Sequence, residues 1–150
     1  MPFVTVFDNR CLWASVTAWF LAQALKIPIS WLLHEDFNLK SFFRAGGMPS
    51  SHSALVVAVS IMVGYTEGWN SALFAVSCSF ASIVMYDAAG VRRETGRQGK
   101  AINQILQYAI FQGRPITDQE MKEIVGHTPL EVLGGMIVGG ISAFLWIVVF

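Results

Sequence analysis

The chain has 150 residues, of which 54% are hydrophobic and only 13% are charged, and its formal net charge is zero. Its mean hydropathy is +0.53. This composition indicates a membrane protein and excludes the basic footprint that a nucleic-acid-binding protein would carry.

Four segments are apolar enough to cross the hydrocarbon of a bilayer, which requires about 20 helical residues. In chain order they are Leu12–Leu33, Ser50–Thr66, Trp69–Val91 and Pro129–Phe150. The first contains Lys26 and Pro28, and the second is short. A further stretch, Ala101–Phe111, has apolar residues at helical spacing but is too short to span, so we expect it to lie at the interface.

These segments predict an all-α integral membrane protein. We expect a helical bundle of about four transmembrane helices plus the short interfacial helix, in a single domain over residues 1–150.

Three polar motifs stand at ends of the apolar segments. Residues 46–53 read GGMPSSHS, residues 86–93 read YDAAGVRR, and residues 126–131 read GHTPLE. Histidines, arginines and carboxylates are unfavourable at a bilayer boundary unless they have a function there. With four spans, all three motifs fall on the same face of the membrane.

The distribution of positive charge predicts which face this is. Eight of the ten Lys and Arg residues fall on the motif face, namely Lys40, Arg44, Arg92, Arg93, Arg97, Lys100, Arg114 and Lys122. Cytoplasmic loops carry an excess of Lys and Arg. We therefore expect the chain in the inner (cytoplasmic) membrane, with the motifs facing the cytoplasm and both termini outside.

The residue types in the motifs indicate phosphate chemistry. The guanidinium groups of Arg92 and Arg93 match phosphate oxygens, and Ser50 and Ser51 with the backbone amides of a helix start form a second anion site. Two histidines supply a nucleophile for phosphorus and an acid for the leaving oxygen. A carboxylate beside the nucleophile can fix its tautomer. The scheme requires no metal and no cofactor.

At these residues the sequence resembles a known superfamily. Pro49–His52 is similar to the Pro-Ser-Gly-His motif of the type 2 phosphatidic acid phosphatases and vanadium haloperoxidases, and His127-x-x-x-Glu131 resembles their His-x-x-x-Asp motif. Nearly the whole chain resembles a divergent branch of that superfamily, made of small membrane proteins that carry all three motifs. The chain departs from the main superfamily in having Glu131 for Asp and no matching Lys and Arg-Pro motif.

The resemblance implies roles for individual residues. His127 would be the nucleophile, Glu131 its orienting acid and His52 the general acid. The phosphate-binding residues would be Arg92 or Arg93 as the clamp, with Lys26, Ser50, Ser51 and, in support, Asp87.

Structural roles for the same residues remain open at this point. Thr128–Glu131 fits a capping box, so Glu131 could act only as a cap, and Ser50 or Ser51 could be an ordinary N-cap. Arg92 and Arg93 could simply end a helix on the cytoplasmic side, and Asp87 could serve only as an ion-pair partner. Gly135-x-x-x-Gly139 has the spacing of helix dimerisation, which suggests a homodimer, but packing within one chain is equally compatible.

We expect a membrane lipid phosphatase that hydrolyses a phosphomonoester or pyrophosphate of a lipid. Phosphatidylglycerophosphate, phosphatidate and polyprenyl pyrophosphate are the candidate substrates. The alternative is a non-catalytic membrane protein or scaffold that binds lipid phosphates. The expected partners are the phosphorylated lipid and the bilayer, without nucleic acid.

Overall fold

Four helices form the bundle. The computed structural model describes residues 6–32, 47–91, 94–96, 98–99, 101–103, 105 and 127–149. The helices are α2 (Arg10–Leu32), α3 (Ser51–Glu67), α4 (Ala72–Ala89) and α6 (Pro129–Val149). They match the four predicted segments to within a few residues, and the described part of the chain contains no strand, so the predicted all-α class is confirmed.

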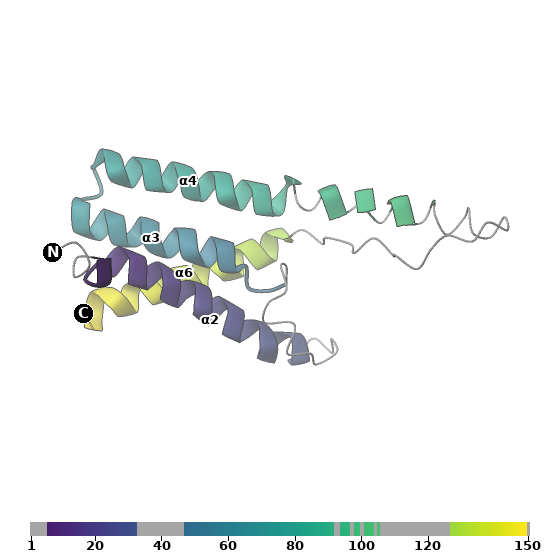
Figure 1. Cartoon of the computed structure of the whole chain (residues 1–150), viewed down its shortest axis with the longest axis horizontal. Helices are drawn as coiled ribbons and strands as arrows, with labels where there is room; N and C mark the ends of the chain where they lie inside the picture. Colours follow the sequence, from purple (N-terminus) through teal and green to yellow (C-terminus); the bar gives the residue numbers. More distant parts are fainter. Residues whose placement is uncertain are drawn as a thin grey trace.

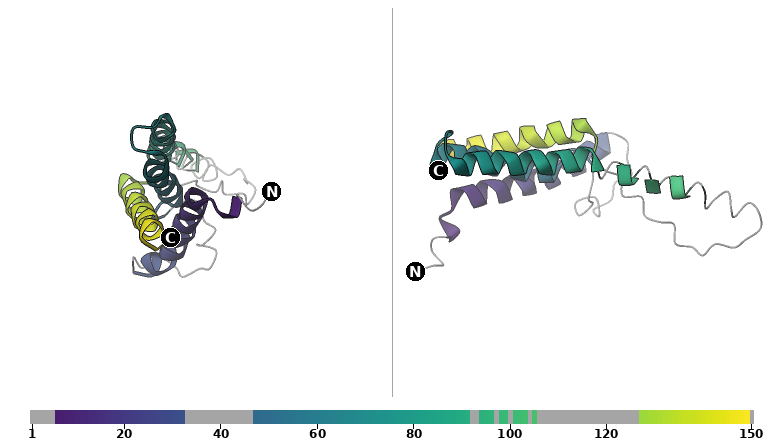
Figure 2. Two further views of the ribbon diagram at one scale, coloured as in Figure 1. Left: turned by 90° about the vertical axis from the view of Figure 1, so that its left-hand side faces the viewer. Right: turned by 90° about the horizontal axis from the view of Figure 1, so that it is seen from above.

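The helices run side by side along one axis (Figures 1 and 2). α3 packs against each of the other three, and α2 also packs against α6. The N-terminal end of α2 and the C-terminal end of α6 lie at one end of the bundle (Figure 1). At the opposite end lie the C-terminal ends of α2 and α4 and the N-terminal ends of α3 and α6, which is where the sequence motifs stand.

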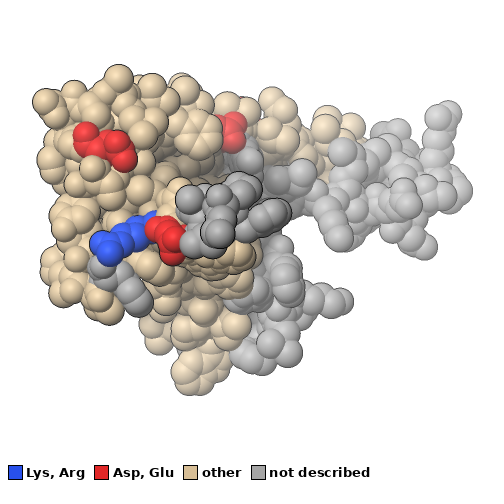
Figure 3. All heavy atoms as spheres, turned by 60° about the vertical axis from the view of Figure 1, so that its left-hand side comes forward, with Lys and Arg blue, Asp and Glu red and all other residues tan. Residues whose placement is uncertain are grey.

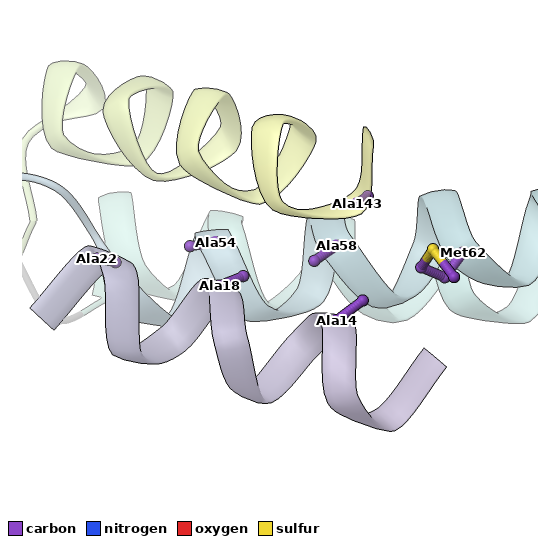
Figure 4. Close-up of a cluster of buried hydrophobic side chains, with 7 residues drawn as sticks. All are labelled: Ala14, Ala18, Ala22, Ala54, Ala58, Met62 and Ala143. Carbon is purple, nitrogen blue, oxygen red and sulfur yellow. The ribbon is translucent and has the colours of Figure 1, made fainter. Parts of the chain in front are cut away.

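Small side chains form the core. The buried hydrophobic cluster consists of Ala14, Ala18, Ala22, Ala54, Ala58, Met62 and Ala143, from α2, α3 and α6 (Figure 4). Alanine faces allow helix backbones to approach closely, which is how helices associate inside membranes. The Ser142 hydroxyl adds a buried hydrogen bond across this interface, donating to the Ala14 carbonyl at 3.0 Å.

Large apolar side chains point outward instead. Val76, Phe80 and Ile83 of α4 and Ile137 and Phe144 of α6 are all more than half exposed. In the face shown in Figure 3, acidic and basic atoms appear only in a few places on an otherwise uncharged surface. An interior of alanine inside a shell of large hydrophobic residues fits lipid as the surrounding solvent.

Three helical runs are long and apolar enough to cross a membrane: α2, the run Ala72–Asn103 that begins as α4, and α6. α3 has 17 residues, which corresponds to about 26 Å at 1.5 Å per residue and is shorter than a bilayer core. The other three helices surround it, so it is covered mainly by protein.

Of the predicted interfacial helix, residues 101–103 and 105 are helical, and the remainder lies outside the described residues.

Gly135 and Gly139 of α6 pack against another helix of the same chain. A Cβ on Gly135 would collide with the carbonyl oxygen of Ser50, and one on Gly139 with the carbonyl oxygen of Ala54. Both glycines are buried at this contact with α3. Of the two readings of Gly135-x-x-x-Gly139, the structure therefore shows packing within one chain.

Candidate phosphate site

Two backbone hydrogen bonds connect the three sequence motifs. The N–H of Ser50 donates to the carbonyl of Glu131 at 2.9 Å, and the N–H of His127 donates to the carbonyl of Ala88 at 3.1 Å. The first bond joins the start of α3 to the first turn of α6. The second joins the residue before α6 to the end of α4. Motifs that are far apart in the sequence thus meet at one end of the bundle.

Ser50 caps α3 and positions the first motif. Its Oγ accepts a hydrogen bond from the Ser53 N–H at 3.4 Å, and the Ser53 hydroxyl lies 3.1 Å from the same oxygen. Of the two candidate caps, the structure therefore selects Ser50, while Ser51 is the first helical residue. Ser50, Ser51 and Ser53 are all buried. Gly135 allows α6 to approach the capped turn directly.

Thr128 performs the equivalent role for α6. Its hydroxyl oxygen accepts a hydrogen bond from the Glu131 N–H at 3.3 Å, and Pro129 is the first helical residue. This is the cap that the sequence predicts. His127 therefore lies just outside the helix, held by its backbone bond to Ala88.

The two motif histidines lie next to each other. The ring centroids of His52 and His127 are 6.3 Å apart, and the ring planes are nearly perpendicular at 88°. Their environments differ: His127 is 2% exposed, whereas His52 is an exposed residue. The exposed imidazole of His52 can exchange protons with the surroundings more readily than the buried imidazole of His127.

Lys26 brings a positive charge to the same end of the bundle. It is only 4% exposed in the C-terminal half of α2, and it interacts electrostatically with Glu131 of α6. A buried ammonium requires an anionic partner because removal from water disfavours the charge. Asp87 is half-buried on α4, directly before the Ala88 carbonyl that holds His127.

Gln23 is a buried polar residue that the sequence analysis did not single out. It is 6% exposed, and its Oε1 has no hydrogen-bond partner among the described residues. Its position in the sequence was a signal. Gln23 is a long polar side chain in the same apolar segment as Lys26, three residues before it. That spacing places both on one helix face.

The predicted arginine clamp, Arg92 and Arg93, lies outside the described residues. The remaining predicted site residues are described, and the structure brings them to one end of the bundle: His52, His127, Glu131, Lys26, Ser50, Ser51 and Asp87. Among the residues that are described, no group of three or more His, Cys, Asp and Glu side chains is placed to hold a metal ion.

Comparison with known proteins identifies the family of the chain. A family model described as "Divergent PAP2 family" matches residues 7–142. A protein of Bacillus subtilis (strain 168) named "Uncharacterized membrane protein YuiD" is 38% identical over 144 residues, covering 89% of this chain and 91% of that protein. No solved structure matches the chain. The chain is therefore an integral membrane protein that belongs to the Divergent PAP2 family.

Proposed function

We propose that this protein is a membrane lipid phosphatase that hydrolyses a phosphomonoester or pyrophosphate of a lipid through a phosphohistidine on His127. The observation that carries the proposal is the pair of adjacent imidazole rings, one buried and one exposed, with centroids 6.3 Å apart. Two such groups can contact opposite sides of one phosphoryl group, as nucleophile and as general acid.

The reaction proceeds in two steps. An imidazole nitrogen of His127 attacks phosphorus, the bond from phosphorus to the lipid oxygen breaks, and protonated His52 gives its proton to that oxygen. Water then attacks phosphorus, the bond from phosphorus to the His127 nitrogen breaks, and neutral His52 takes a proton from the attacking water. Inorganic phosphate leaves, and both histidines return to their starting states. Glu131 is the proposed group that orients His127 and supports its positive charge.

Anion binding would use the positive and dipolar groups around the histidines. Lys26 supplies a buried ammonium, and the first turn of α3 supplies backbone N–H groups at the positive end of a helix. Arg92 and Arg93 are proposed to add the guanidinium clamp, because they follow the end of α4 in the sequence. A site among apolar helices suits a substrate whose acyl or prenyl chain stays in the bilayer.

A phosphate-release assay tests the proposal. Purified protein is incubated with phosphatidylglycerophosphate, phosphatidate and polyprenyl pyrophosphate, beside the variants His127→Ala and His52→Ala. We expect turnover of at least one lipid and a loss of about a hundredfold or more in each variant, the usual effect of removing a nucleophile or general acid. Ser79→Ala is the control, because the Ser79 hydroxyl is exposed on α4 and bonds only its own helix.

The competing function predicts a different outcome. A non-catalytic lipid-phosphate-binding protein would bind these lipids but release no phosphate. Binding without turnover, or equal turnover in wild type and His127→Ala, would therefore replace the phosphatase proposal.

A further inference from the structure

Two buried oxygens in the candidate site lack hydrogen-bond partners among the described residues. They are Oε1 of Gln23 and Oε2 of Glu131. Nearly all buried polar atoms in native proteins are hydrogen-bonded, because leaving one unsatisfied disfavours the folded state. Each exception therefore needs an explanation, and functional sites are among the places where such exceptions are expected.

The two oxygens belong to one cluster around Lys26. Gln23 and Lys26 are three residues apart on α2, so they share a helix face, and both are buried. Lys26 interacts electrostatically with Glu131 on α6. The backbone carbonyl of Glu131 in turn accepts the Ser50 N–H at the start of α3. Glu131 therefore links the Lys26 ammonium to the helix start that would bind a phosphoryl group, and Gln23 lies on the same face of α2 as Lys26.

The chemistry of these oxygens restricts what can lie against them. An amide carbonyl and a carboxylate accept hydrogen bonds but cannot donate them. A fully deprotonated phosphate also offers only acceptors, so its oxygens would be repelled. A ligand that presents a hydroxyl beside an anionic oxygen could donate to the acceptors while its anionic oxygen lies near the Lys26 ammonium.

We propose that Gln23 Oε1 and Glu131 Oε2 form a hydroxyl-recognition subsite beside the phosphoryl group, with Gln23 as its specificity-determining residue. This inference rests on the proposed function of the same site. The hydroxyl can be the P–OH of a singly protonated phosphoryl group or an alcohol hydroxyl of the lipid headgroup. The shared chemistry is a hydrogen-bond donor held next to an anion.

Two inorganic anions provide the first test. At neutral pH inorganic phosphate is present as H2PO4⁻ and HPO4²⁻, which both carry a P–OH, whereas sulfate carries no hydroxyl. Gln23→Met keeps the length of the side chain and removes the acceptor; Leu25→Met, at an exposed position on α2, is the matched control. Binding to purified protein is measured by titration calorimetry. We expect wild type and Leu25→Met to prefer phosphate over sulfate by about tenfold, the effect of one hydrogen bond to a charged ligand.

Gln23→Met should lose that preference by weakening phosphate binding alone. An equal loss for both anions would mean that Gln23 merely positions Lys26, and it would overturn the subsite. Unchanged affinities would overturn it too. If Gln23→Met melts too easily for titration, Gln23→Asn replaces it with the same expectation, because the shorter side chain withdraws the oxygen by one methylene.

Two short-chain lipids identify the source of the hydroxyl. Both phosphatidate and phosphatidylglycerophosphate have an ionisable P–OH, but only the second has an alcohol hydroxyl in its headgroup glycerol. A loss of affinity for both lipids in Gln23→Met would assign the P–OH, and a loss for phosphatidylglycerophosphate alone would assign the alcohol. If Gln23→Met bound both lipids as tightly as wild type does, the proposed subsite would be contradicted. Because the readout is binding, absence of phosphate release would overturn the phosphatase proposal without deciding this one.

Discussion

At the scale of single residues, long polar and ionisable side chains are buried at one end of a bundle whose core consists mostly of small side chains. Gln23, Lys26, Ser50, Ser51 and His127 are all less than a tenth exposed. Removing such groups from water is unfavourable unless they are paired or used. Their concentration where three motifs meet, together with the adjacent His52 ring, is the main reason to assign a ligand to this end.

Ser50 provides a residue-scale prediction. Ser50→Ala removes the oxygen that accepts from the Ser53 N–H and lies beside the Ser53 hydroxyl. We expect a loss of about 1 kcal/mol in stability, the usual effect of deleting a helix cap, and a lower melting temperature in detergent. Ser79→Ala should melt like wild type, because its exposed hydroxyl bonds only the Ala75 carbonyl. Equal melting of the two variants would refute the structural role of the cap.

At the scale of helices, hydropathy was sufficient to predict the four elements because each is a continuous apolar run. The short length of α3 and the caps at Ser50 and Thr128 were also visible in the sequence. The bonds from Ser50 to Glu131 and from His127 to Ala88 were not, because they join distant segments through backbone atoms that carry no sequence signal. The same applies to Gln23, whose burial depends on how α2 packs.

The sequence also left the role of the α6 glycines open, and the contacts with α3 decide it. Gly135→Ala and Gly139→Ala would each force the Cβ into α3 backbone, so α6 must shift. We expect a loss of about 1–3 kcal/mol for each, as for other overpacked interiors, and reduced activity for Gly135→Ala because its neighbour is Ser50.

Gly140→Ala is the matched control for this pair. Its added Cβ would meet nothing closer than the Ile61 Cδ1 at 4.0 Å, so we expect near-native melting and activity. Melting curves in detergent compare the three variants. Because alanine favours a helix more than glycine does, a Gly140→Ala protein as unstable as Gly135→Ala would show that the close approach to α3 does not determine the effect.

At the scale of the whole molecule, the bundle has two ends with different chemistry. The start of α2, the end of α6 and the turn between α3 and α4 are at one end, and the candidate site is at the other (Figure 1). In the sequence, eight of the ten Lys and Arg residues stand between α2 and α3 or between α4 and α6. By the positive-inside rule we predict that the site faces the cytoplasm.

Cysteine labelling in intact cells tests this orientation. In a variant whose Cys11 and Cys78 are replaced by serine, Asn70→Cys should react with a membrane-impermeant reagent, because residue 70 is exposed in the turn between α3 and α4. Gln98→Cys, at an exposed helical residue beyond the C-terminal end of α4, should react only after the cells are permeabilised. The reverse pattern would place the site outside and indicate extracytoplasmic substrates.

The central claim is that His127 carries the phosphoryl group during turnover, and trapping of the intermediate tests it most directly. The protein is mixed with a lipid substrate labelled in its phosphate, quenched under alkaline conditions within a fraction of a turnover, and digested for mass spectrometry. The account predicts an acid-labile phosphoryl group on His127, absent in His127→Ala. Turnover with no phosphorylated histidine, or with the label on another residue, would contradict it.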